Sequence, residues 1–124
     1  MTVGKGNMAT VLVVDDEDAL LALVAAVVED GGNQPLIARN GQDALRVLER
    51  LHALPALIVS DVMMPQMGGI ALAQRLKDDP LYRRIPFVLM SAAPLATMQM
   101  ADAFIAKPFD LDILDALLQR LINS

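Results

Sequence analysis

The sequence lacks cysteine entirely, and this absence excludes disulfide bonds, thiolate metal sites and cysteine nucleophiles. It has a single histidine, His52, so a metal site built from several histidines is excluded as well. Aromatic residues make up only 3% of the chain, whereas hydrophobic residues of all kinds make up 55%. With 124 residues, the chain is therefore expected to form one domain whose core consists of aliphatic side chains and methionine.

Long hydrophobic runs and clustered basic residues are also missing. The longest apolar run, residues 19–28, is about half as long as the ~20 residues that a membrane-spanning helix needs. The first apolar run is ended at once by acidic residues, which is not typical of a signal peptide. The formal net charge is −5 and the basic residues are scattered, which argues against nucleic-acid binding. We expect a cytoplasmic protein whose partners are proteins or cations, with a flexible segment at residues 1–8 and one domain at residues 9–124.

Strands and helices are predicted to alternate along the whole chain. Five short apolar runs rich in β-branched residues predict strands at residues 10–14, 34–38, 56–60, 86–90 and 103–106. Segments with helical periodicity lie at residues 17–30, 41–51, 69–77, 95–100 and 111–122. Strands that are apolar on both faces and alternate with helices predict a parallel sheet covered on both sides. We therefore expect a doubly wound α/β fold, a (βα)5 three-layer sandwich, with the strand order 2-1-3-4-5 known for sheets of this class.

Polar residues stand at the carboxyl ends of the predicted strands, where such sheets bind their ligands. Asp15 and Asp16 follow the first strand, and Asp61 follows the third. Because neighbouring carboxylates repel one another, protons or a cation must neutralise them. Oxygen ligands without histidine or cysteine favour a hard cation, and Mg²⁺ fits best. In the alternative interpretation Asp15 and Asp16 only cap the following helix, and for Asp16 the two roles are compatible.

Two further strand-end residues, Ser91 and Lys107, complement the acidic cluster. Ser91 offers a hydroxyl donor and Lys107 a positive charge, so together they can hold a tetrahedral anion. Phosphoryl transfer requires positioning and charge neutralisation of this kind. The sequence therefore indicates Asp61 as a nucleophile that forms an aspartyl phosphate.

Four motifs carry a resemblance to a known family. They are VLVVDDE at residues 11–17, SDVMMPQMGG at residues 60–69, VLMSA at residues 88–92 and AKPF at residues 106–109. In this order and at strand ends, they resemble the receiver domain of two-component response regulators, from Ala9 to the end of the chain. The resemblance implies that Asp61 accepts a phosphoryl group from a phosphohistidine, which a sensor histidine kinase or a histidine phosphotransfer protein carries.

The resemblance also implies roles for other residues. The implied ligands of Mg²⁺ are Asp15, Asp16, Asp61 and the backbone carbonyl oxygen of Met63. Ser91 and Lys107 would each contact a phosphoryl oxygen, and a cis peptide bond before Pro108 would direct the lysine inward. Phe104 takes the place of the family's aromatic switch residue, which turns inward when the serine moves toward the phosphoryl group.

The sequence departs from the family pattern in two helices. Only residues 92–102 separate Ser91 from Ala103, the first residue of the fifth predicted strand, so the fourth helix is expected to be shortened or absent. In the first helix, the periodicity predicts a buried stripe of Leu20, Leu23, Val24, Val27 and Val28. It places a second apolar set on the outside of the helix: Leu21, Ala22, Ala25 and Ala26. In the family that the sequence resembles, the first helix packs on the phosphohistidine-bearing partner, so the resemblance implies that these residues form the dock. The alternative is that the alanines only favour helix formation.

We therefore expect a phospho-accepting receiver of a two-component phosphorelay that switches contacts with an unknown output protein, as a monomer or weak homodimer. It would catalyse only its own phosphorylation and dephosphorylation, and it is either a single-domain protein or a fragment of a larger response regulator. One alternative is a Mg²⁺-dependent phosphatase of the haloacid-dehalogenase type, but that class has D-x-D after its first strand, whereas Asp15 and Asp16 are adjacent. Another is a flavodoxin-like flavin carrier, whose cofactor phosphate the acidic residues 15–18 would repel.

Overall fold

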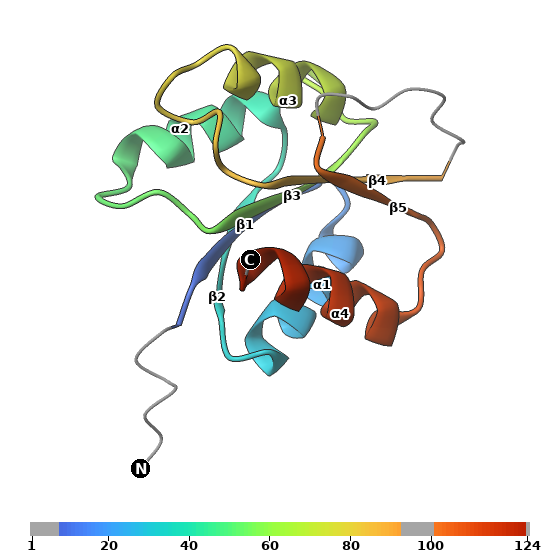
Figure 1. Cartoon of the computed structure of the whole chain (residues 1–124). Helices are drawn as coiled ribbons and strands as arrows, with labels where there is room; N and C mark the ends of the chain where they lie inside the picture. Colours follow the sequence, from blue (N-terminus) through green and yellow to red (C-terminus); the bar gives the residue numbers. More distant parts are fainter. Residues whose placement is uncertain (1–7, 93–100, 124) are drawn as a thin grey trace.

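Five parallel strands form one sheet in the order β2-β1-β3-β4-β5, and helices cover both of its faces (Figure 1). The computed structural model describes residues 8–92 and 101–123. The strands are β1 (Thr10–Val14), β2 (Gln34–Ala38), β3 (Leu57–Asp61), β4 (Phe87–Ser91) and β5 (Ala103–Ala106). The helices of the described residues are α1 (Asp18–Asp30), α2 (Gly41–Arg50), α3 (Gly69–Lys77) and α4 (Leu111–Ile122). Helices α1 and α4 lie on one face of the sheet, and α2 and α3 lie on the other (Figure 1).

Side chains of the central strands alternate between two buried cores. In β1, Val11 and Val13 belong to the core under α1 and α4, whereas Leu12 and Val14 belong to the core under α2 and α3. Every residue of β3 and β4 is buried. Each fully buried aliphatic side chain contributes about 1.5–3 kcal/mol, so the two cores provide the main favourable term in folding. None of the described helices is long and apolar enough to cross a membrane.

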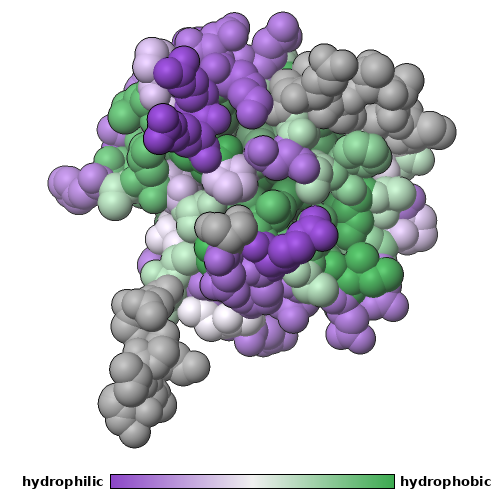
Figure 2. All heavy atoms as spheres, in the orientation of Figure 1, coloured by the Kyte–Doolittle hydropathy of each residue, from purple (hydrophilic) through white to green (hydrophobic). Residues whose placement is uncertain are grey.

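Several large apolar side chains remain on the surface around β5 and α4. Phe104 is 54% exposed, and Leu111 and Ile113 at the start of α4 are exposed as well. Figure 2 shows the viewed face as a mixture of hydrophilic and hydrophobic patches, with hydrophobic side chains gathered on the side where β5 and α4 lie. The exposed position of Phe104 means that this side chain points away from the core of the sheet.

The predicted fold class and the predicted strand order are confirmed. Strands β3 and β4 each begin and end one residue later than predicted, so Asp61 and Ser91 are the last residues of these strands rather than the first residues after them. The predicted helical segment at residues 95–100, and with it the expectation of a shortened or absent fourth helix, lies outside the described residues.

The prediction for the outer face of α1 is wrong at two of its four residues. Leu21 and Ala25 are buried, whereas Ala22 and Ala26 are exposed. Leu23, which the periodicity assigns to the buried stripe, is 40% exposed. The physical reason is that α1 packs against α4 as well as against β1 and β2. The side that faces α4 therefore buries residues that a helix lying only on a sheet would expose.

Candidate functional site

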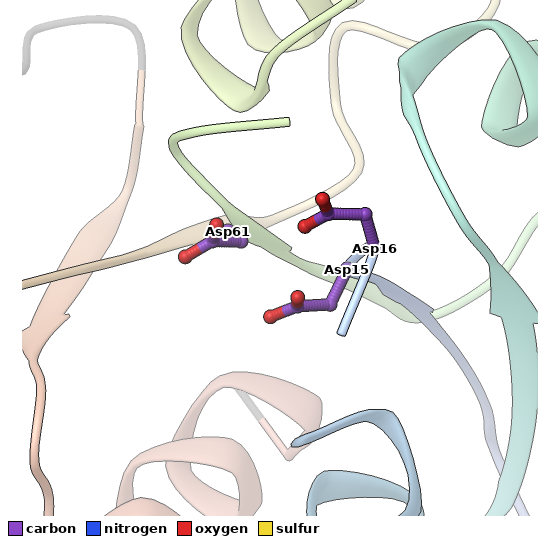
Figure 3. Close-up of side chains that lie close together, drawn as sticks. All are labelled: Asp15, Asp16 and Asp61. Carbon is purple, nitrogen blue, oxygen red and sulfur yellow. The ribbon is translucent and has the colours of Figure 1, made fainter. Parts of the chain in front are cut away.

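The predicted site residues meet at the edge of the sheet where the parallel strands end. Asp15 directly follows β1, Asp61 and Ser91 are the last residues of β3 and β4, and Lys107 directly follows β5. Figure 3 shows the side chains of Asp15, Asp16 and Asp61 pointing into one region from the ends of β1 and β3. One oxygen from each of these three carboxylates lies within 4.8 Å of the others. These residues thus lie together, as their positions at the predicted strand ends indicated.

Asp15 is fixed in place at the bottom of this acidic cluster and is only 1% exposed. Its backbone N–H donates to the carbonyl oxygen of Ala38 at 3.1 Å, which ties the end of β1 to β2. Its Oδ1 accepts a hydrogen bond from the backbone N–H of Glu17 at 2.9 Å. Its Oδ2 is buried and accepts no hydrogen bond from the described residues. A buried carboxylate oxygen without a donor is unfavourable, and a bound cation would satisfy it.

Lys107 supplies the positive charge of the site. Its Nζ lies 2.5 Å from Oδ1 of Asp61 and 3.7 Å from Oδ2 of Asp15. Its backbone N–H donates to the carbonyl oxygen of Ser91 at 2.8 Å, and a cis peptide bond joins it to Pro108. The lysine is therefore held by its backbone and by both carboxylates.

The pKa values of Asp15 and Lys107 are both raised above their ordinary values. Burial raises the pKa of Asp15 above its ordinary value, and the negative charges of Asp61 and Asp16 act in the same direction, against the opposing effects of the Glu17 N–H and Lys107. Burial alone would lower the pKa of Lys107, but the hydrogen bond to Asp61 and the surrounding negative charges outweigh it, so the pKa rises. Lys107 therefore stays cationic at neutral pH, whereas the folded protein disfavours the negative charge on Asp15.

The turn after Asp61 depends on two glycines. A Cβ atom at Gly69 would lie 2.1 Å from the carbonyl oxygen of Asp61, and a Cβ atom at Gly68 would lie 2.7 Å from the carbonyl oxygen of Val62. The N-terminus of α3 can pack this tightly on the end of β3 only because neither residue has a side chain. The close contact fixes the backbone that carries Asp61.

The remaining predicted residues differ in their positions. Ser91 is buried at the end of β4, one strand away from Asp61. Met63 is 78% exposed, and its predicted role concerns only its backbone carbonyl oxygen. Phe104 lines a shallow hollow with Ile113 on the side of α4, outside the acidic cluster.

Two residues that the sequence did not single out, Asn40 and Gln66, lie in the loops that follow β2 and β3, and their side chains form a hydrogen bond. Asn40 directly precedes the predicted second helix, and an asparagine at that place is a recognisable helix-capping signal. Nothing in the sequence indicates its contact with Gln66, because the two residues come from different loops.

Comparison with known proteins agrees with this geometry. A sequence model of the family described as "Response regulator receiver domain" matches residues 11–119. The chain belongs to this family. Response regulator Rre1 of Synechocystis sp. is 36% identical to this chain over 120 residues, which cover 91% of this chain and 51% of Rre1. The chain thus spans about half the length of this relative.

Solved structures of other receiver domains are similar to this one. The signal receiver domain of a signal transduction histidine kinase from Syntrophus aciditrophicus is 33% identical, with a TM-score of 0.82 over 93% of this chain and 90% of that one. The receiver domain of the sensor histidine kinase PA1611 from Pseudomonas aeruginosa, solved with a magnesium ion coordinated in its active-site cleft, has a TM-score of 0.83 at 24% identity, over 94% and 99% of the two chains. At this identity the second similarity supports the fold.

Proposed function

We propose that Asp61 is the residue of this receiver domain that accepts the phosphoryl group from a phosphohistidine. The supporting observation is the convergence of three carboxylates and one lysine at the carboxyl ends of the strands, with Asp61 in contact with Lys107. A carboxylate oxygen of Asp61 forms the new bond to phosphorus while the donor's N–P bond breaks, and the electron pair of that bond returns to the imidazole. Lys107 and Ser91 then contact oxygens of the transferred group, because both stand at the same edge of the sheet.

We propose Mg²⁺ as the cation of the site. The donor set is made of oxygen atoms only, and Oδ2 of Asp15 lacks a hydrogen-bond donor among the described residues. The magnesium ion of the Pseudomonas aeruginosa receiver supports this choice. The proposed ligands are Asp15, Asp16, Asp61 and the backbone carbonyl oxygen of Met63. When bound, the ion neutralises the charge of the carboxylates and of the incoming phosphoryl group.

We propose that the phosphohistidine-bearing partner docks beside the site on α1. Ala22 and Ala26 are exposed there, as the sequence predicted. An apolar hollow of about 330 Å³ lies between the start of α1 and the segment after β5. Its lining residues are Glu17, Leu20, Leu23, Ala92, Lys107, Pro108 and Phe109. Because Lys107 lines this hollow and also contacts Asp61, a protein docked there would lie close to Asp61.

We propose that Ser91 and Phe104, the expected switch pair, transmit the phosphorylation state of Asp61 to an output protein. The proposed activity is limited to phosphorylation and dephosphorylation of the domain itself. The division at residues 1–8 and 9–124, the cytoplasmic location, the absence of nucleic-acid binding and the monomeric or weakly dimeric state stay predictions. The haloacid-dehalogenase alternative receives no support from the family match.

The proposed function is tested by incubation with acetyl phosphate and Mg²⁺, followed by intact-mass measurement and peptide mapping. We expect the mass of one phosphoryl group on the wild-type protein, located at Asp61, and none on Asp61→Asn. Lys77→Ala, which changes an exposed charge in the last turn of α3, serves as a control and should be phosphorylated normally. Phosphorylation of Asp61→Asn to the wild-type extent would disprove the assignment.

A further inference from the structure

Asn40 joins the loops that follow β2 and β3, at the edge of the sheet where Asp15 and Asp61 lie. Its Nδ2 donates a hydrogen bond to Oε1 of Gln66 at 3.1 Å. Next to this contact, the backbone N–H of Gly41 donates to the carbonyl oxygen of Met67 at 2.8 Å. Gln66 and Met67 belong to residues 62–68, the loop between β3 and α3. This loop is therefore tied to the N-terminus of α2 at two neighbouring residues.

Gln66 has a backbone conformation that needs such support. Its φ angle is 69°, and among the described residues it is the only one other than glycine with a positive φ. Residues with a side chain adopt this conformation rarely, and it persists where the surroundings hold it. The backbone N–H of Met67 donates to the carbonyl oxygen of Pro65 at 2.8 Å, which closes a tight turn around Gln66. The hydrogen bond from Asn40 fixes the side chain of that turn.

The loop and α2 are packed too closely for the contact to be incidental. A Cβ atom at Gly41 would lie 2.5 Å from Cγ and 2.8 Å from the carbonyl oxygen of Met67. Both distances are shorter than real Cβ contacts, so α2 can begin at this place only with a glycine. The Asn40–Gln66 hydrogen bond lies at the edge of this tight contact, where it can hold the two loops in register.

We infer that Asn40 is a positioning residue for the phosphoryl-transfer site, because through Gln66 it holds the loop that carries Met63. The inference rests on the proposed function, in which the backbone carbonyl of Met63 is a ligand of Mg²⁺. The two ends of the Asn40 side chain have separate tasks. Its Oδ1 accepts a hydrogen bond from the backbone N–H of Asp43 at 2.8 Å and caps α2, while its Nδ2 holds Gln66.

The variant Asn40→Ser separates these two tasks. Serine caps helices about as well as asparagine, but its side chain is too short to reach Gln66. In the metal-free protein, we expect the amide hydrogen of Gly41 to exchange about tenfold faster, with unchanged exchange in β1. In calorimetric titrations, the dissociation constant of Mg²⁺ should rise about three- to tenfold. Asn123→Ser at the far end of α4 is the matched control and should change none of these values.

A double-mutant cycle with Gln66→Gly decides whether Asn40 acts through Gln66. Glycine removes the side-chain partner and tolerates the positive φ. In the Gln66→Gly background, Asn40→Ser should change the Mg²⁺ dissociation constant less than about 1.5-fold. The inference is overturned if Asn40→Ser raises the Mg²⁺ dissociation constant equally in the wild-type and Gln66→Gly backgrounds. It is also overturned if the wild-type protein binds Mg²⁺ and Asn40→Ser changes neither the amide exchange of Gly41 nor the Mg²⁺ affinity. A wild-type protein that binds no Mg²⁺ would instead refute the proposed cation site, and this inference with it.

Discussion

The buried carboxylate of Asp15 is predicted to destabilise the metal-free protein at neutral pH, and Asp15→Asn tests this. Asparagine has the same shape, and its side-chain oxygen can still accept the hydrogen bond from the backbone N–H of Glu17. The substitution removes a negative charge whose Oδ2 has no hydrogen-bond donor among the described residues. It should therefore raise the free energy of unfolding when no cation is present, although it damages the proposed metal site.

The magnitude follows from the charges around Asp15. At an effective dielectric constant of about 20, two unit charges ~4 Å apart interact by about 4 kcal/mol. The carboxylate of Asp15 is attracted by Lys107 at 3.7 Å and repelled by Asp16 and Asp61, whose oxygens lie within 4.8 Å. The attraction therefore offsets roughly one of the two repulsions. The repulsion that remains is weakened by solvent at the exposed Asp16, and the desolvation of Oδ2 adds to it. We expect a net stabilisation of about 1–2 kcal/mol in the variant, in the range of the ~1–3 kcal/mol that unsatisfied buried polar groups cost.

The effect should depend on pH in a defined direction. Burial, together with the charges of Asp61 and Asp16, raises the pKa of Asp15 above its ordinary value of 3.8. Between that value and the higher pKa of the folded protein, the folded state binds more protons than the unfolded state. The wild-type protein should therefore lose stability as pH rises through this interval, and the variant should not. The two proteins should have similar stabilities in acid and differ most near pH 7.

Urea unfolding followed by circular dichroism measures both effects. With a chelator at pH 7, the midpoint of Asp15→Asn should be higher by about 1 M urea, since unfolding slopes for small domains are ~1–3 kcal/mol per M. With Mg²⁺ at about 100 times its dissociation constant, the wild-type protein should gain ~2.7 kcal/mol and the variant little, so that the order of stability reverses. Asp78→Asn, the same charge change at an exposed residue after α3, is the control and should stay within about 0.5 kcal/mol of the wild type. A variant that is less stable than the wild type in chelator at pH 7 would refute the reasoning.

Three further predictions concern the turn after the nucleophile, the docking face and the buried side of α1. Gly69→Ala should lower the free energy of unfolding by about 1–3 kcal/mol, because the added carbon would lie 2.1 Å from the carbonyl oxygen of Asp61; an unchanged urea midpoint would contradict this. Ala22→Glu should fold normally and accept phosphate from acetyl phosphate, but transfer from a phosphohistidine donor should slow severalfold. Leu21→Glu should unfold the domain, since Leu21 is buried. Normal donor-dependent transfer in Ala22→Glu would place the dock elsewhere.

The sequence predicted the sheet and the site from the same property of parallel strands. Continuous apolar runs identified strands buried on both faces, and the alternation with helices then limited the sheet to a doubly wound arrangement. All strands of such a sheet end at one edge, so the polar residues after β1 and β5 had to meet those that end β3 and β4. The positions of Asp15, Asp61 and Lys107 were therefore predictable without any contact information.

Contacts between loops were not predictable in this way. Asn40 and Gln66 are 26 residues apart and lie in loops whose relative position depends on how α2 and α3 pack on the sheet. The sequence marks the second loop as a turn through Pro65 and Gly68, but turn residues do not show which neighbouring loop the turn contacts. The positive φ of Gln66 has no sequence signal either, since glutamine is not a residue that favours it.

The buried face of α1 was mispredicted because an apolar helix carries no polar marker of its orientation. In α2, charged residues identify the outer face, and Ala44 and Leu48 are buried as an amphipathic pattern requires. Helix α1 has no charged residue between Asp18 and Glu29, so its periodicity fits several rotations about the helix axis almost equally well. The packing of α4 against α1 selects one of them and turns Leu21 inward. The same rotation turns Leu23 outward into the hollow that Lys107 lines, and Lys107 in turn contacts Asp61.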